Sequence, residues 1–266
     1  FSGYRSTETV KFLDSNRGLH RIMPLEQFNT NWYAYFAHST VGGYRPVKLR
    51  SYQDLLDAKA LNNGAVQDML NVKYVITDKV LPGNQYQLVH QSNTKVYENI
   101  SVLPKAWFVE TTVPAKDMAA SLMAILENDF DPRKMAVVQG HDMNAELTVG
   151  SVKVTEYSEN RITLETQSGG DGFLVISENY YDPGWKASVD GIKTEIYRTN
   201  HLLRGLTVPI GNHKIVFTVN DSTYRTARFI SLIGIVLTLT VICVLYCSDL
   251  RSFTEYIMRR KERIGV

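Results

Sequence analysis

The sequence predicts an α+β fold with one transmembrane helix near its C-terminus. Three observations support this prediction: helical and strand signals mix in the first 113 residues, eight short alternating segments follow residue 134, and an apolar run without charge lies near the C-terminus. The predicted parts are a mixed α/β unit (1–113), a connecting helix (114–135), an antiparallel β-sandwich (136–225), a transmembrane helix (226–248) and a basic tail (249–266).

In the first unit, capping and turn residues separate short helices and strands. Ser51 stands where an N-cap is expected, and Gly64 precedes another helical segment. β-Branched and aromatic residues mark a strand at 72–77, and alternating residues after Leu81-Pro82-Gly83-Asn84 indicate a hairpin. Helices are predicted over 6–13, 52–58 and 65–70, and strands over 20–23, 72–77 and within 85–98.

The next part begins at Pro114 with apolar residues at helical spacing, and Asp131-Pro132 ends the run. Short alternating segments then follow at regular intervals, separated by turns such as Asp182-Pro183-Gly184 and Asp190-Gly191. Such spacing is typical of a β-sandwich. The predicted strands are 135–138, 145–157, 161–166, 173–179, 186–189, 194–197, 202–208 and 213–220.

Residues 229–248 carry no charge and are long enough to cross a bilayer core of about 30 Å. Five Arg and Lys residues follow this run and only two, Arg225 and Arg228, immediately precede it, which predicts a cytoplasmic C-terminus and an extracytoplasmic region over 1–225. The sequence shows no N-terminal export signal. We therefore expect further transmembrane helices upstream of Phe1 in the intact, multi-pass protein of the cell membrane.

Composition and motif content exclude several classes of function. The 29 basic and 27 acidic residues are too evenly balanced for a nucleic-acid-binding surface. Both cysteines, Cys243 and Cys247, lie in the apolar run, and the six histidines are scattered, so no metal site or cofactor is predicted. Sequence motifs of hydrolases, zinc proteases and nucleotide-binding enzymes are absent, which argues against a free-standing enzyme.

Two stretches are richer in glycine, aromatic and charged residues than a core requires. In residues 38–53, a Gly-Gly turn permits close approach of the backbone to a ligand, while basic side chains and a tyrosine could contact an anion or a sugar. In residues 178–204, aromatic side chains could stack on a sugar or simply anchor the fold. The candidate substrate-binding residues are His38, Gly42, Gly43, Tyr44, Lys48, Arg50, Glu178, Tyr181, Trp185 and Arg204.

A structural interpretation of both stretches stays open. If residues 38–53 serve only the fold, Tyr44 should be buried and Arg50 should pair with Asp54, one helical turn further on.

Five blocks in order resemble the C-terminal exterior region of the bacterial YfhO family of polytopic membrane proteins. They are GGYRPVKLRSYQ, MLNVKYVI, KAWFV, ENYYDPGWKASVDG and NHLLRGLTVPIGNHKIVF. The resemblance spans roughly residues 30 to 220 and departs from the family pattern at Arg45, where a histidine is expected, and at Gly205-Leu206.

This resemblance implies a likeness to GT-C glycosyltransferases, which pass a sugar from a polyprenyl-phosphate carrier to a cell-envelope polymer. Their catalytic acid lies in an early exterior loop, so no catalytic residue is assigned in this chain. The expected partners are the lipid bilayer, the polyprenyl-phosphate sugar and the envelope polymer. The alternative is a non-catalytic module of a transport or structural protein that binds envelope glycans or a partner protein.

Overall fold

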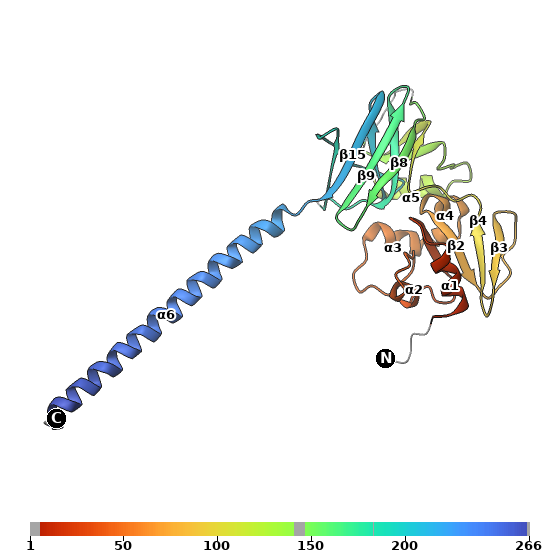
Figure 1. The fold of residues 1–266 in the computed structure, drawn as a ribbon. Helices are drawn as coiled ribbons and strands as arrows, with labels where there is room; N and C mark the ends of the chain where they lie inside the picture. Colours follow the sequence, from red (N-terminus) through yellow and green to blue (C-terminus); the bar gives the residue numbers. More distant parts are fainter. Residues whose placement is uncertain (1–5, 141–146, 183, 265–266) are drawn as a thin grey trace. The chain divides into compact units, whose positions relative to one another are not determined.

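The computed structural model describes residues 6–140, 147–182 and 184–264, and it forms two compact units, 1–219 and 220–266 (Figure 1). The α+β class with a C-terminal apolar helix is confirmed. The predicted turn at Asp182-Pro183-Gly184 and the start of the predicted strand 145–157 lie partly outside the described residues.

The N-terminal part of the first unit contains a four-stranded sheet, sheet A, in the order β1-β2-β4-β3. β1 and β2 are parallel, and the other neighbours are antiparallel. Its elements are α1 (Glu8–Ser15), β1 (Arg21–Pro24), α2 (Trp32–Tyr35), α3 (Arg50–Asp57), η1 (Ala60–Asn62), α4 (Gly64–Met69), β2 (Val72–Thr77), β3 (Tyr86–Gln91) and β4 (Lys95–Asn99).

Side-chain caps explain where two of these helices begin. The Thr7 hydroxyl accepts a hydrogen bond from the backbone N–H of Val10 at the start of α1. Asn63 accepts bonds from the first N–H groups of α4. The sequence analysis predicted these helices within a few residues, but it missed α2 and η1.

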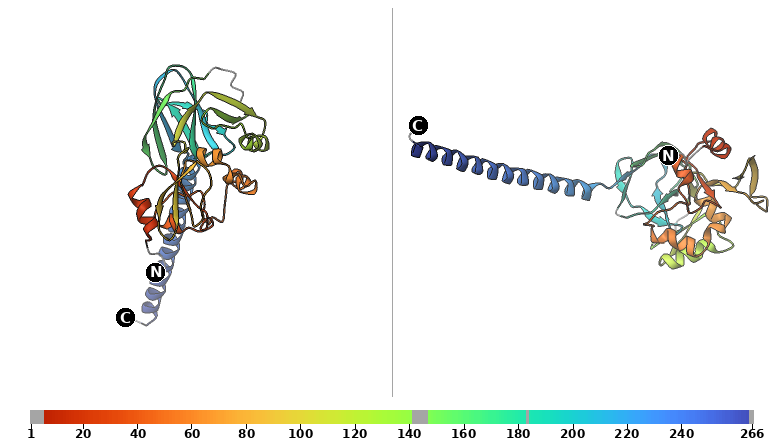
Figure 2. Two further views of the ribbon diagram at one scale, coloured as in Figure 1. Left: turned by 90° about the vertical axis from the view of Figure 1, so that its right-hand side faces the viewer. Right: turned by 90° about the horizontal axis from the view of Figure 1, so that it is seen from below.

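The remaining strands form a mixed six-stranded sheet B, in the order β5-β10-β14-β13-β7-β6, and an antiparallel five-stranded sheet C, in the order β12-β11-β15-β9-β8. Figure 1 labels β8, β9 and β15 of sheet C, and Figure 2 gives two further views of the chain. Their elements are β5 (Ala106–Val109), β6 (Thr111–Ala115), α5 (Met118–Leu126), β7 (Met135–Gln139), β8 (Ser151–Tyr157), β9 (Arg161–Ser168), β10 (Gly172–Asn179), β11 (Trp185–Val189), β12 (Ile192–Thr194), β13 (Tyr197–Thr199), β14 (Leu203–Val208) and β15 (Gly211–Val219).

Sheet B is covered on both faces, because alternate side chains of its strands enter different cores. Phe108 and Leu174 point into a core shared with sheet C, where they meet residues such as Phe217. Trp107 and Phe173 point to the other side, into a core built with α3, α4 and α5. Around sheet B, the first unit therefore has a layer of helices on one face and sheet C on the other, while sheet A is a third sheet of the same unit.

The sandwich extends beyond the predicted boundaries. β5 and β6 lie within the predicted 1–113 unit or across its end, yet both belong to sheet B. The predicted connecting helix, α5, joins the parallel strands β6 and β7 and packs on the same sheet. The division at residue 113 stays a prediction, but sheet B runs across it.

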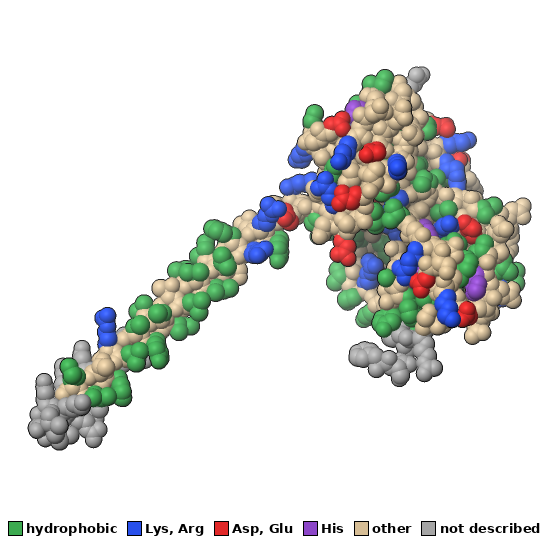
Figure 3. Space-filling model, viewed as in Figure 1, with side chains coloured by type: hydrophobic (Ala, Val, Ile, Leu, Met, Phe, Trp, Pro, Cys, Tyr) green, Lys and Arg blue, Asp and Glu red, His purple; other side chains and the backbone are tan. Residues whose placement is uncertain are grey.

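α6 (Ser222–Ile264) forms the second unit, and its segment Ser222–Cys247 is apolar enough to cross a membrane, with a mean hydropathy of 2.6. Figure 3 shows hydrophobic side chains along this helix. The Thr238 and Thr240 hydroxyls donate to carbonyl oxygens one turn earlier, at 2.8 Å each, so they leave no unsatisfied donor for the lipid.

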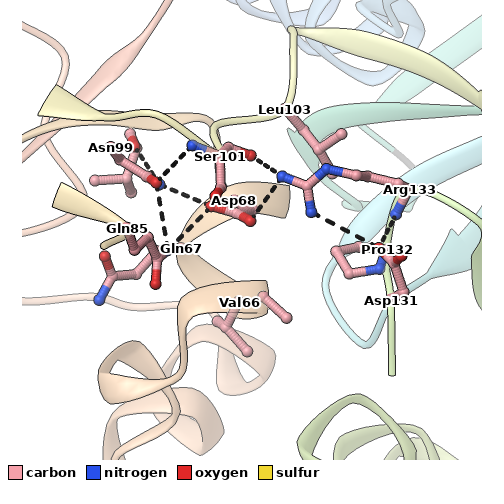
Figure 4. A network of polar contacts seen from close by, with 12 residues as sticks. Val66, Gln67, Asp68, Gln85, Asn99, Ser101, Leu103, Asp131, Pro132 and Arg133 are labelled. Carbon is pink, nitrogen blue, oxygen red and sulfur yellow. Dashed lines mark hydrogen bonds and ion pairs between the residues drawn. The ribbon is translucent and has the colours of Figure 1, made fainter. Parts of the chain in front are cut away.

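The buried carboxylate of Asp68 on α4 links the N-terminal part of the first unit to Arg133, in the segment that precedes β7 (Figure 4). Its Oδ1 accepts a hydrogen bond from Asn99 at 2.7 Å, and its Oδ2 accepts one from Arg133 at 2.9 Å. Burial raises the pKa of Asp68 above its ordinary value, although Asn99 and Arg133 oppose this effect. The negative charge of Asp68 is therefore stabilised by the nearby positive charge of Arg133, which offsets the cost of burial.

We expect Arg133→Met to reduce the free energy of unfolding by about 2 kcal/mol at neutral pH, because it leaves a buried carboxylate without its cation. The loss should shrink at acidic pH, where Asp68 is protonated and needs no counterion. Urea unfolding of the full chain in detergent measures both values. Arg161→Met, which breaks the exposed pair with Glu156, is the matched control and should cost under about 0.5 kcal/mol. Equal losses in the two variants would contradict the assignment.

Candidate functional site

A pocket of about 330 Å³ lies where β1, the loop 39–49 and the end of β10 come together. Both stretches singled out in the sequence contribute to its lining. Gly42, Gly43 and Lys48 come from the first stretch, and Glu178 comes from the second. The fold therefore places side by side two segments that are more than 120 residues apart in the chain.

Glu178 occupies the floor of this pocket in a cluster of opposite charges. Its Oε1 accepts hydrogen bonds from Arg21 at 2.9 Å and from the Tyr157 hydroxyl at 2.7 Å, and Lys105 forms an ion pair with the same oxygen. The Lys105 ammonium also lies 4.8 Å from the centre of the Tyr157 ring. The carboxylate side chain is only 18% exposed, so it is a structural counterion in a largely dry setting.

Arg21 is fully engaged by the protein at both of its terminal nitrogens. Nη1 donates to the Leu70 carbonyl oxygen and to the Ser177 hydroxyl, both at 2.9 Å. Nη2 donates to the Ser177 carbonyl oxygen and to Glu178, also at 2.9 Å. Arg21 thus joins sheet A to sheet B and keeps no Nη atom for a ligand.

Burial and neighbouring charges shift the pKa values of the residues in this cluster. Burial alone would raise the pKa of Glu178, but Arg21 and Lys105 outweigh it and hold the pKa at about 2. Burial, reinforced by Arg21, lowers the pKa of Lys105 to about 8. Burial and the neighbouring Glu178 raise the pKa of Tyr157. Glu178 is consequently ionised at neutral pH and is a weak base.

A second buried cation stands behind the pocket. Arg204 donates from Nε to the carbonyl oxygen of Asn179, a lining residue, at 2.8 Å, and its guanidinium lies 4.1 Å from the centre of the Trp185 ring. Burial lowers the pKa of Arg204 to about 10. Arg204 and Trp185 lie outside the lining, and Arg204 contacts the pocket through the carbonyl oxygen of Asn179.

The Gly-Gly turn is explained by contacts within the protein. A Cβ at Gly42 would come within 2.3 Å of the Phe28 carbonyl oxygen, and Gly43 has a φ of +114°. The backbone N–H of Gly43 donates to that same oxygen at 2.6 Å. The close approach that these glycines permit is to the Phe28 backbone, and it places the loop 39–49 over β1.

Two cations at the opening remain available. Arg45 and Lys48 line the pocket and are exposed, and the described residues offer neither of them a hydrogen bond or an ion pair. Three cations and one carboxylate line the pocket, and the carboxylate is already neutralised by Arg21 and Lys105. The opening is thus a site of net positive charge, suited to an anion.

The other predicted site residues lie outside the lining. The side chain of His38 is a largely buried neighbour of Asp14, with its Nε2 3.3 Å from Oδ1. Arg50 pairs with Asp54 at 2.7 Å, as the structural interpretation required, whereas Tyr44 is 70% exposed, against that interpretation. Tyr181 is also exposed and packs on Gly184.

Sequence reasoning missed Arg21, Lys105 and Tyr157. Arg21 was read only as part of a strand, and Lys105 only as part of the block KAWFV. Their signal was weak, because a charged residue inside or beside an apolar strand segment can equally well be exposed. In the described ranges, no group of three or more His, Cys, Asp or Glu residues is arranged to hold a metal ion.

One comparison with known proteins gives a match. The family model described as Bacterial membrane protein YfhO matches residues 141–231, which cover β8 to β15 and the beginning of α6. The match confirms the resemblance drawn from the sequence blocks, in this part of the chain. No curated protein and no solved structure matches the chain.

The Glu178 cluster predicts acid sensitivity. Because the folded-state pKa of about 2 lies below the ordinary 4.5, the cluster stabilises the fold above pH 4.5, and this stabilisation is lost as pH falls towards 2. The loss should be about 3 kcal/mol, as followed by urea unfolding in detergent across this range. Glu178→Gln should be less stable at neutral pH and should lack this part of the pH dependence. Glu156→Gln, in an exposed pair, should keep it. An unchanged pH dependence in Glu178→Gln would refute the cluster's role.

Proposed function

We propose that this chain, a YfhO-family membrane protein by its match over residues 141–231, is the exterior C-terminal region of a multi-pass protein that assists sugar transfer from a polyprenyl-phosphate carrier to a cell-envelope polymer. The observation that carries the proposal is the pocket with Arg45 and Lys48 at its opening. Its proposed role is to hold an anionic group of the carrier or of the polymer while transfer takes place.

The size and the chemistry of the pocket support this role. A volume of about 330 Å³ is at the small end of ligand pockets, which span about 300–1,000 Å³, and suits one sugar or one phosphate-bearing unit. Cationic side chains without protein partners form charge-assisted hydrogen bonds with phosphate oxygens. Carrier phosphates and phosphate-containing envelope polymers are anions, so both fit the same opening.

The same geometry argues that this region positions a substrate and does not itself catalyse transfer. A general base for the acceptor hydroxyl should have a pKa near the working pH, whereas the pKa of Glu178 is about 2. All cations on the pocket floor are bound to protein groups. We therefore place the catalytic carboxylate outside this pocket.

The second candidate function is a non-catalytic module that binds envelope glycans or a partner protein in a transport or structural protein. The low pKa of Glu178, about 2, is also compatible with this second function, because a binding module needs no general base. The two candidates differ in one outcome. Loss of the pocket's anion binding should reduce sugar transfer in the first case and leave it unchanged in the second.

The topology belongs to this proposal as well. We infer that residues 1–225 face outward and the C-terminus faces the cytoplasm, because Arg251, Arg259, Arg260, Lys261 and Arg263 follow the apolar run and only Arg225 and Arg228 immediately precede it. A cysteine at Val80, which is 78% exposed, should react with a membrane-impermeant maleimide added to intact cells. Reaction only after cell lysis would reverse the topology.

Replacing both Arg45 and Lys48 by alanine in the full-length protein should lower envelope glycosylation at least about tenfold, because two charge-assisted contacts are lost. Glycan analysis of the purified envelope polymer measures this. Arg50→Ala is the matched control, since Arg50 is equally basic and exposed but is paired with Asp54 outside the pocket. Protein accumulation and membrane insertion should be unchanged in both. Normal glycosylation in the double variant would refute the first candidate function.

A further inference from the structure

We infer that the loop 44–48, together with Tyr35, is a membrane-contact surface that rests in the headgroup layer of an anionic lipid bilayer. This inference goes beyond the proposed function, because it concerns a lipid surface and not a sugar-bearing ligand, although Arg45, Val47 and Lys48 also line the pocket. Three features support it: the side chains exposed on this surface, the basic and aromatic residues in it, and the candidate membrane span in the same chain.

The surface presents large side chains that the fold leaves uncovered. Val47 is 86% exposed, Tyr44 is 70% exposed and Tyr35 is 62% exposed. Single exposed apolar residues are common in soluble proteins and need no explanation. Here one tip joins an exposed valine and an exposed tyrosine to two cations, and this combination calls for a partner.

The base of the loop is firmly held, so the exposure of its tip is built into the fold. The Asn31 side chain accepts from the backbone N–H of Tyr44 at 2.9 Å and donates to its carbonyl oxygen at 3.2 Å. Tyr35 ends the short helix α2, which follows Asn31 directly in the chain, and its N–H donates to the Asn31 carbonyl oxygen at 3.0 Å. The Tyr52 hydroxyl donates to the Val41 carbonyl oxygen on the other side. Such a tip loses little conformational entropy on binding.

The composition of the loop fits a lipid surface. Tyrosine favours the boundary between headgroups and acyl chains, and Lys and Arg reach the lipid phosphates while their stems remain apolar. Residues 41–50 contain three basic residues and no acidic residue, and Arg45 and Lys48 have no partner among the described residues. An anionic bilayer neutralises these two charges and covers Val47 at the same time.

The candidate membrane span in the same chain would also keep this surface tethered to a bilayer. Ser222–Cys247 of α6 is a candidate membrane span in the same polypeptide, so the first unit is tethered to any bilayer that this span crosses. A tether of this kind makes a second contact intramolecular in effect, and a weak surface then suffices. Weak interfacial contacts acquire their strength in this way when another anchor is present.

The test uses the full chain with Cys243 and Cys247 replaced by alanine and Val47→Cys labelled with a polarity-sensitive fluorophore. The protein is reconstituted in vesicles of phosphatidylglycerol and phosphatidylethanolamine in equal parts, with a nitroxide on some headgroups. We expect strong quenching and a blue-shifted emission. Val80→Cys is the matched control, because Val80 is 78% exposed and lies in another loop, and its label should be little quenched.

Charge reversal distinguishes contact with anionic lipid from contact with a second protein. Arg45→Glu with Lys48→Glu in the labelled chain should lower the ratio of docked to free loop at least about tenfold, and phosphatidylcholine vesicles should have a similar effect. Thermal unfolding matching that of the parent shows that these exposed substitutions leave the fold intact.

Equal quenching at positions 47 and 80, or quenching that persists after charge reversal, would overturn the inference. Shielding of the position-47 label only when a second protein is added would also overturn it, in favour of a protein partner. None of these readouts depends on glycosylation, so this inference and the proposed function can fail separately.

Discussion

The first unit depends on a carboxylate that is largely shielded from water. Glu178 stands at the end of β10, and the groups that compensate its charge come from β1, from the approach to β5 and from β8. Removing a charge from water costs several kcal/mol, so these groups have to stay together. Arg21 also donates hydrogen bonds to Leu70 and Ser177, and in this way one guanidinium joins sheet A to sheet B. The pocket is the space that this arrangement leaves beneath the loop 39–49.

Local chemistry made much of the fold predictable. The strand Val72–Thr77 followed from its β-branched residues and the candidate membrane span from its lack of charge, whereas α4 begins one residue earlier than predicted, at Gly64, after the Asn63 cap. β6 was misread because Pro114 was taken to begin a helix. Pro114 in fact lies in an edge strand, where a missing N–H is tolerated. β5 was missed because its four buried residues show no alternation of apolar and polar side chains.

The candidate site was harder to predict than the fold. Gly42, Gly43, Lys48 and Glu178 were chosen from the sequence and do meet at one pocket. Their joint position follows from pairing between distant strands, which no local pattern encodes. Residues that look alike in the sequence also separate in space: Lys48 is at the opening, whereas Arg50 turns to Asp54. The partner of a basic side chain is a tertiary property, and residue type alone does not reveal it.

The central position of sheet B bears on how this region can be divided. The segment matched by the family model starts at residue 141, after β5, β6 and β7. β10 lies between β5 and β14, and its Phe173 and Val175 pack in the core formed with α4 and α5. A polypeptide cut at the start of that segment would expose an unpaired strand edge and one bare apolar face of the sheet. The segment that the family model matches is thus shorter than the compact unit 1–219, because sheet B also needs strands that lie before residue 141.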